Sequence, residues 1–212
     1  MSKKSITMPE YIVFAKDNFK KNDIKTIFEI GGLDGKDSLL FKKEFQNAEV
    51  YMFEALHENY MNCINKLKNI HVFNYVIFNR NGRIKFYKKN INGLHSVFDR
   101  GKKYGTKAIR LKCYRMDTVC KKLNIKCIDM LKIDVEGATL EVLKGLGKLL
   151  NTVKIMHIET EDYPFFKGQK LDNEVSKFLL TKRFKLIART GFNPTQKGKQ
   201  YDTVWIKDSN SK

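Results

Sequence analysis

A glycine-rich turn in the first quarter of the chain constrains its fold most strongly. The apolar run Thr26–Ile30 ends at Gly31 and Gly32, and a third glycine, Gly35, follows shortly after. Residues 37–45 then place leucines and phenylalanines at helical spacing. A buried strand, a tight turn and a helix in this order are typical of doubly wound α/β folds, in which ligands bind at the carboxyl ends of the strands.

The same alternation of strand and helix runs through most of the chain. Short apolar runs predict further strands at residues 49–53, 70–77, 128–133 and 153–158. Helical spacing predicts helices at residues 9–21, 57–67, 117–123, 138–150 and 170–180. Strands that alternate with helices form right-handed crossovers, so the sequence predicts a mostly parallel sheet.

Two regions depart from this alternation. Residues 184–189 and 202–207 predict consecutive strands without a helix between them, so we expect seven strands with one antiparallel strand at the edge. Residues 83–87 and 109–113 also alternate like strands and predict a small extra β-hairpin insertion. The residues between them, 88–107, predict a long loop, and loops of this length in a compact domain are usually functional.

Length and composition limit the class of protein. With 212 residues and 3 prolines, we expect one domain over residues 1–212, in which residues 1–22 form an N-terminal helix. The sequence shows no apolar run of about 20 residues and no secretory signal, so we expect a soluble, cytoplasmic protein. The 4 cysteines lack ligand spacing, which favours reduced thiols over a zinc site.

The chain is strongly basic. Its 41 Lys and Arg residues against 23 Asp and Glu residues give a net charge of +18. This charge permits a nucleic-acid partner, but the cations are spread from one end of the chain to the other. That spread favours an ordinary solvated surface over a nucleic-acid interface.

The glycine turn follows the pattern Glu-x-Gly-x-x-x-Gly. A dinucleotide fingerprint needs glycine where this chain has Glu29, and no Gly-Lys-Ser/Thr of a P-loop follows. Glu29 would repel a pyrophosphate, but it could bind the ammonium of the aminocarboxypropyl group of S-adenosylmethionine. Glu54, at the end of the next strand, could accept hydrogen bonds from both hydroxyls of a ribose. The pattern therefore favours a nucleoside cofactor other than NAD.

A second block carries the most specific signal. Residues 131–138 read Leu-Lys-Ile-Asp-Val-Glu-Gly-Ala, and residues 140–145 read Leu-Glu-Val-Leu-Lys-Gly. With residues 50–54, 81–86 and 115–117, this block resembles the FkbM-type methyltransferase family over most of residues 26–159. The chain departs from the family at Gly31-Gly32-Leu33-Asp34-Gly35, where Gly-Ala-Asn-x-Gly is usual, and at Glu54-Ala55-Leu56, where Glu-Pro-x is usual.

The resemblance implies a Rossmann-like class I methyltransferase fold and methyl transfer from S-adenosylmethionine to a hydroxyl of a sugar or glycan, for example a deoxyhexose such as rhamnose. The residues that we expect to bind the cofactor are Glu29, Gly31, Gly32, Leu33, Asp34, Gly35, Ser38, Glu54, Ala55 and Val76.

Acidic residues and a histidine at neighbouring strand ends are the candidates for chemistry. We expect Asp134, His157 and Glu159 to be catalytic, since a base must remove the hydroxyl proton. We expect His95, Ser96 and Glu136 to contact the acceptor, with His95 and Ser96 on the long loop. Asp134, Glu159 and Asp162 could alternatively hold a divalent metal, because such ions prefer several carboxylate oxygens.

Two other functions stay open at this point. The positive charge would suit an RNA ribose O-methyltransferase, although no Lys-Asp-Lys-Glu set of such enzymes is evident. The chain could also keep the fold as a non-catalytic binding module. The acceptor, the metal requirement and the oligomeric state are not fixed by the sequence.

Overall fold

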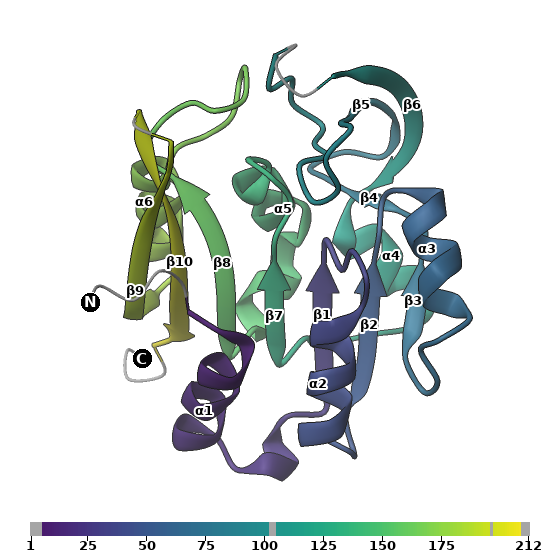
Figure 1. Ribbon diagram of the computed structural model, residues 1–212. Coiled ribbons are helices and arrows are strands. Elements are labelled where there is room, and N and C mark those ends of the chain that lie inside the picture. The colour runs from purple at the N-terminus through teal and green to yellow at the C-terminus, as the bar shows by residue number, and fades with distance from the viewer. Residues whose placement is uncertain (1–5, 102–104, 196, 209–212) are drawn as a thin grey trace.

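The computed structural model describes residues 6–101, 105–195 and 197–208. A seven-stranded sheet with the order β3-β2-β1-β7-β8-β10-β9 forms its centre (Figure 1). The bounds of its strands are β1 Thr26–Ile30, β2 Glu49–Phe53, β3 His71–Phe73, β7 Met130–Ile133, β8 Ile155–Glu161, β9 Phe184–Thr195 and β10 Gly198–Lys207. The predicted Rossmann-like α/β class is therefore confirmed.

One strand of this sheet is reversed, as expected, but its position differs from the prediction. Strand β10 pairs antiparallel with β8 on one side and with β9 on the other. The reversed strand therefore lies one place inside the edge, and β9 forms the edge. The two strands are also longer than predicted, because β9 continues through residues 191–195 and β10 begins at Gly198, where a loop was expected.

Helices cover both faces of the sheet, each with its own core. Helices α1 (Met8–Asn18), α2 (Lys36–Glu44) and α3 (His57–Ile64) pack on one face around Tyr11 and Phe41. Helices α4 (Met116–Leu123), α5 (Thr139–Gly145) and α6 (Asp172–Thr181) pack on the other face around Met116 and Leu143. The result is the three-layer arrangement that buries a parallel sheet on both sides. No described helix is both long and apolar enough to cross a membrane.

The predicted helix at residues 138–150 is interrupted. Helix α5 ends at Gly145, and a 3₁₀ helix, η3 (Gly147–Thr152), follows it. A Cβ atom at position 145 would lie 2.2 Å from the carbonyl oxygen of Phe78, so the chain needs glycine there to pass Phe78. A second 3₁₀ turn, η1 (Lys21–Asp23), follows α1.

A second, three-stranded sheet stands above the carboxyl ends of β1 and β2 (Figure 1). Its strands are β4 (Val76–Ile77), β5 (Gly82–Lys88) and β6 (Lys107–Tyr114), in the order β4-β6-β5. The antiparallel pair β5 and β6 is the predicted hairpin insertion. The single strand predicted at 70–77 is wrong, because the chain leaves the main sheet after β3 and enters the small sheet at β4.

Candidate functional site

The glycine turn packs tightly against the loop that follows β7. Gly31 has a φ of 88°, and a Cβ atom there would lie 1.7 Å from the carbonyl oxygen of Asp134. Its N–H donates to the carbonyl of Phe53 at the end of β2 (2.9 Å). Position 31 therefore accepts only glycine, and the turn is held between the ends of two neighbouring strands.

Glu54 ties this turn to the end of β2. One of its carboxylate oxygens accepts from the N–H of Leu33 (2.9 Å), and the other accepts from the N–H of Leu56 (2.8 Å). Burial raises the pKa of Glu54, although these hydrogen bonds oppose the rise. The oxygen that bonds to Leu56 also accepts from the side-chain amide of Asn59 (3.4 Å). A carboxylate offers about four acceptor positions, so the oxygen that bonds to Leu33 can still accept from a ligand hydroxyl.

A cavity opens between the two sheets, with the glycine turn and Glu54 in its wall. Predicted residues that line it are Gly31, Leu33, Glu54, Ala55, Val76, His95, Asp134, Glu136 and Glu159. Apolar and amide side chains that were not predicted complete the wall: Ile30, Phe53, Asn59, Tyr75, Ile77, Phe86, Val97, Val135 and Ala138.

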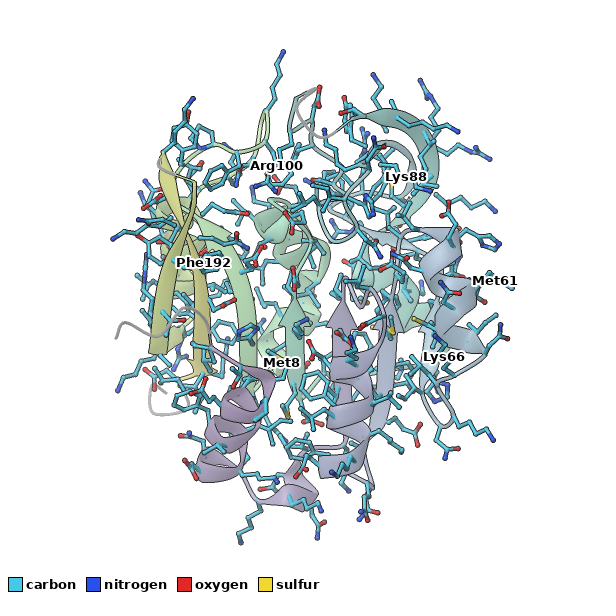
Figure 2. All side chains as sticks on the ribbon, in the orientation of Figure 1. Met8, Met61, Lys66, Lys88, Arg100 and Phe192 are labelled. Atoms are coloured by element: carbon cyan, nitrogen blue, oxygen red, sulfur yellow. The ribbon has the colours of Figure 1, made fainter. Side chains whose placement is uncertain are left out.

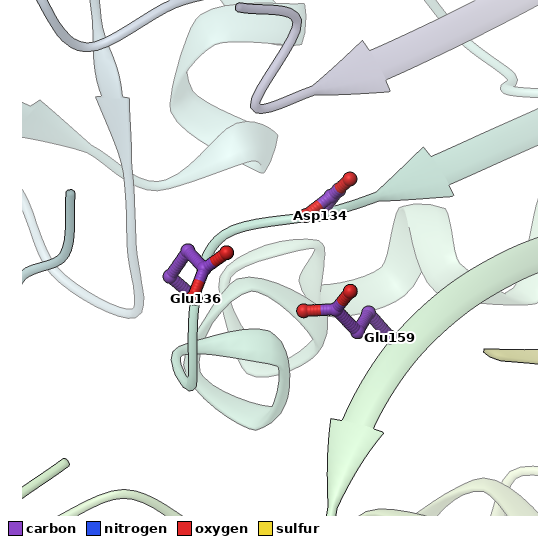
Figure 3. Close-up of side chains that lie close together, drawn as sticks. All are labelled: Asp134, Glu136 and Glu159. Atoms are coloured by element: carbon purple, nitrogen blue, oxygen red, sulfur yellow. The ribbon is translucent and has the colours of Figure 1, made fainter. Parts of the chain in front are cut away.

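Three carboxyl groups converge in this cavity (Figure 3). Asp134, Glu136 and Glu159 each place an oxygen within 4.8 Å of the others. Burial, and then the charge of Asp134, raise the pKa of Glu136 and of Glu159 well above the usual range. One oxygen of Glu159 is buried without a hydrogen-bond partner among the described residues. The group can share protons or hold a divalent cation.

Asp162 does not belong to this group, so its predicted role as a metal ligand is wrong. Its oxygens accept from the N–H of Lys199 (2.7 Å) and from the hydroxyl of Tyr201 (2.9 Å). Strand β8 extends to Glu161, so Asp162 lies beyond the strand end that faces the cavity. Glu136 takes the third place in the group instead.

Glu29 lies beneath the glycine turn and not in the cavity wall. Its side chain is buried, accepts from the Ser38 hydroxyl, and lies 3.4 Å from the ammonium of Lys132. Burial raises the pKa of Glu29 to about 7, although Lys132 and Ser38 oppose the rise. Glu29 and Ser38 therefore support the turn from below. To contact a cofactor directly, as predicted, they would have to give up these partners.

Apart from Leu33, the other residues of the glycine turn contribute to its backbone conformation and not to the cavity wall. Gly35 has a φ of 75° and precedes α2, while a Cβ atom at Gly32 would meet the side chain of Met52 at 2.3 Å. Asp34 points to solvent and pairs with Lys36 (2.6 Å). Of the turn residues 32–35, Leu33 therefore lines the cavity, while Gly32, Asp34 and Gly35 do not belong to its lining.

The long loop places one of its two predicted site residues in the cavity wall. His95 lines the cavity, and its Nδ1 accepts from the N–H of Lys89 (3.0 Å). Its Nε2 lies 3.0 Å from the Asn92 side-chain oxygen, so the proton resides on Nε2. Ser96 is buried and donates to the carbonyl of Glu136 (2.6 Å). Ser96 therefore anchors the loop and does not face the cavity.

Arg100 lies on the same loop, in the upper part of the view in Figure 2. Its guanidinium lies 3.4 Å from a carboxylate oxygen of Glu136 and 5.0 Å from the ring centre of Phe166. A backbone bridge between Asp99 and Lys167 joins the two loops beside it. Arg100 therefore connects the loop at 88–107 to the loop that follows β8.

His157 does not reach the cavity. Its ring lies 5.5 Å from the ring of Tyr11 on α1, and its Nε2 lies 3.6 Å from Asp202. Burial, and then Lys132, lower the pKa of His157 to about 3, so the imidazole is neutral. Since β8 continues for four residues beyond it, His157 lies within the strand and not at its end. The structure does not support its predicted role as a catalytic base.

One cavity is thus lined by the glycine turn, by Glu54 after β2 and by Asp134 and Glu136 after β7. The family comparison agrees with this arrangement. Residues 29–186 match the family model described as Methyltransferase FkbM domain. The chain belongs to the FkbM methyltransferase family. Membership confirms the predicted family and the enzyme class, an S-adenosylmethionine-dependent methyltransferase.

A curated relative of this FkbM methyltransferase is the 2-O-methyltransferase NoeI of Sinorhizobium fredii (strain NBRC 101917 / NGR234). The two chains are 26% identical over 160 residues, which cover 68% of this chain. The matched region spans 66% of the length of NoeI.

Solved structures support the fold. Magnesium protoporphyrin IX methyltransferase (ChlM) from Synechocystis PCC 6803 aligns with a TM-score of 0.52 and 8% identity, over 95% of this chain and 78% of that chain. The fibrillarin pre-rRNA processing protein of Methanococcus jannaschii gives a TM-score of 0.52 and 12% identity, over 87% of this chain and 68% of that chain. At these identities the likeness concerns the fold alone.

Besides the apolar and amide wall residues, two charged residues at the FkbM methyltransferase site were not predicted, Lys132 and Arg100. Lys132 lies inside the quoted Leu-Lys-Ile-Asp block, and a cation within a fully buried strand is a signal that a buried partner exists. Arg100 has no such signal, because its contacts join two loops that are far apart in the sequence.

Proposed function

We propose that this FkbM methyltransferase transfers a methyl group from S-adenosylmethionine to a hydroxyl of a sugar or glycan, such as a deoxyhexose. The observation that carries the proposal is the group of three carboxyls in the cavity beside the glycine turn. Carboxylates suit the hydroxyl-rich face of a sugar, because each oxygen accepts hydrogen bonds. The name of NoeI, a 2-O-methyltransferase, supports transfer to oxygen.

The residues present fit the cofactor. Gly31 lines the cavity and lets the turn pack against the carbonyl of Asp134, which keeps the turn beside the cofactor. Glu54 would accept the ribose hydroxyls, and the apolar side chains of Phe53, Val76 and Ile77 would pack against the adenine. Glu29 would act from below by fixing the turn through Ser38.

S-adenosylmethionine, when bound, supplies an activated methyl group on a sulfonium. The protein must then align the acceptor oxygen with this methyl group and remove the hydroxyl proton. The hydroxyl proton of the acceptor would pass to a carboxylate of the cavity as the acceptor oxygen takes up the methyl group. We assign this role to Asp134 or Glu159, because Asp134 follows β7, Glu159 lies on the neighbouring strand β8, and both line the cavity.

The three carboxyls could also perform this task through a divalent cation that binds two sugar hydroxyls. In that case Asp134, Glu136 and Glu159 would serve as its ligands and would lower the pKa of the acceptor hydroxyl through the ion. Dialysis against EDTA followed by addition of Mg²⁺ or Mn²⁺ separates the two routes, because only the second loses and regains methyl transfer.

The proposal is tested with radiolabelled S-adenosylmethionine against a panel of acceptors: fucosides and rhamnosides, a short single-stranded RNA, and small phenols. We expect label on a deoxyhexoside and none on the RNA or the phenols. The Glu54→Ala variant serves as the control and should transfer no label to any acceptor. Label on RNA alone would contradict the sugar acceptor and favour an RNA ribose acceptor. A wild-type chain that binds no S-adenosylmethionine would contradict the proposed methyl transfer as a whole.

A further inference from the structure

The outer face of the small sheet carries four cations in register. Arg83 and Lys85 on β5 and Arg110 and Lys112 on β6 are all exposed, and we call these four residues the basic ribbon. Arg83 lies directly opposite Lys112, and Lys85 directly opposite Arg110. Strands β5 and β6 contain no acidic residue.

The basic ribbon has no described counter-ion. None of its residues forms an ion pair with another described residue. By contrast, Lys88 at the end of β5 pairs with Glu58. Like charges directly opposite each other on an antiparallel pair destabilise the pairing. Two such pairs in succession therefore point to an external anion that compensates the repulsion.

The inner face of the same strands belongs to the enzyme. Ile84 and Phe86 are buried, and Phe86 also lines the cavity. Because side chains alternate along a strand, the cations point away from the cavity. The basic ribbon is therefore separate from the acceptor site and can hold a partner while the cavity is occupied.

The rings beside the basic ribbon distinguish between two kinds of anionic partner. Sequence-tolerant binding of single-stranded RNA relies on aromatic rings on which bases stack. Here the two outward-facing rings are already used: the ammonium of Lys85 lies 5.6 Å from the ring centre of Tyr87, and that of Lys122 lies 5.3 Å from that of Tyr114. Cations without an open stacking ring suit lipid headgroups better than bases.

An apolar side chain near the ribbon agrees with a lipid surface. Ile91, three positions beyond β5, is 47% exposed. Stable attachment to a bilayer generally needs two signals, such as a basic patch together with an apolar insertion. We propose that the basic ribbon docks the enzyme on an anionic lipid surface, with the cavity open on the other side of the small sheet.

The test is co-sedimentation of the full chain with vesicles of phosphatidylcholine, either alone or with 30% phosphatidylserine. We expect binding only to the anionic vesicles, and weaker binding as the salt concentration rises. The variant Arg83→Gln/Lys85→Gln/Arg110→Gln/Lys112→Gln should lose binding by about a hundredfold or more, since each cation near an anionic surface contributes roughly 1 kcal/mol. The affinity of the double variant Lys85→Gln/Arg110→Gln for anionic vesicles should lie between those of the wild type and the fourfold variant.

A matched control removes the same charge elsewhere. The variant Lys20→Gln/Lys43→Gln/Lys66→Gln/Lys68→Gln changes four exposed lysines, and Figure 2 shows Lys66 well away from Lys88 at the end of β5. This control should bind the anionic vesicles like the wild type. The ribbon variants should unfold at the wild-type temperature or above it, because the repulsion is relieved.

Three results would overturn the proposal. The first is a wild-type chain that does not sediment with anionic vesicles, and the second is equal binding by the ribbon variant and the control. The third is ribbon-dependent binding of a 20-nucleotide single-stranded RNA without vesicle binding, which would make the partner a nucleic acid. None of these measurements requires methyl transfer, so the outcome is independent of the proposed acceptor.

Discussion

The ammonium of Lys132 lies 3.4 Å from a carboxylate oxygen of Asp134, two positions farther along the chain. The same ammonium lies 2.8 Å from Asp37 on α2 and 3.4 Å from Glu29 on β1. Burial alone would lower the pKa of Lys132, but these three carboxylates together raise it. One buried cation therefore links the support of the glycine turn to a carboxyl of the cavity.

Substitution Lys132→Met should be strongly destabilising. It leaves the buried Glu29 without its cation, and loss of one partner of a buried ion pair costs about 3–5 kcal/mol. Urea unfolding measures the loss. The control Lys170→Met removes an exposed partner of Glu174 and should leave the unfolding midpoint close to that of the wild type, because exposed ion pairs contribute little to stability. Equal unfolding midpoints for the two variants would show that Lys132 does not carry this role.

The pH dependence of stability should contain a contribution from His157. Its pKa is lowered from 6.5 to about 3 by burial, so the unfolded chain binds a proton between these values that the folded chain excludes. This contribution is fully present above pH 6.5 and is lost as the pH falls towards 3. The free energy of unfolding of His157→Gln should therefore fall less steeply than that of the wild type over this window, and methyl transfer should persist.

Parallel stability curves for His157→Gln and the wild type would contradict the buried, neutral imidazole. A complete loss of methyl transfer in a folded His157→Gln variant would indicate that His157 takes part in catalysis after all.

The acid limb of the activity profile should depend on Glu161. Burial and neighbouring carboxylates, Glu161 among them, raise the pKa of Glu159, so a carboxylate base gains activity as the pH rises through that raised value. Glu161→Gln removes one negative charge and should move the acid limb of kcat/KM to lower pH. Glu174→Gln, an exposed acid on α6, is the control. An unmoved acid limb would show that Glu159 does not titrate in the reaction.

Arg100 should hold in position the long loop between β5 and β6, which carries His95. Arg100→Ala should raise the KM for the sugar acceptor by about tenfold, which corresponds to roughly 1.4 kcal/mol, and should leave the Kd of S-adenosylmethionine unchanged. Arg100→Lys should restore little, because an ammonium cannot reproduce a planar guanidinium that lies over Phe166 and Phe165. Full recovery by lysine would reduce the role of Arg100 to its charge.

Much of the fold follows from periodicity, because a strand buried on both faces reads as a short apolar run wherever it occurs. The errors arise where the chain changes direction for reasons that depend on distant residues. The chain leaves the main sheet after Phe73, and β4 then pairs with β6, which lies more than 30 residues further on. Gly145 ends α5 because the backbone of Phe78 lies against it.

The site was predictable where a residue directly follows a strand and difficult where strand length decides. Asp134 follows β7 and reaches the cavity as expected. Strand β8 was predicted to end at residue 158, but it continues to Glu161. Both His157 and Glu159 therefore lie within the strand, where His157 packs against Tyr11 of α1 and Glu159 lines the cavity. The strand is three residues longer than predicted, so its end alone does not identify the residue that reaches the cavity.

The central claim is that the three clustered carboxyls of the cavity act on the acceptor, while the glycine turn and Glu54 hold S-adenosylmethionine, the methyl donor. The most direct measurement uses Asp134→Asn and Glu54→Gln, with calorimetry for S-adenosylmethionine and labelled-methyl transfer to the deoxyhexoside found in the panel. Asp134→Asn should bind the donor within about threefold of the wild type and lose transfer by about a hundredfold, the scale expected for loss of a general base. Glu54→Gln should lose donor affinity first. Wild-type transfer by Asp134→Asn together with wild-type donor binding by Glu54→Gln would contradict the account.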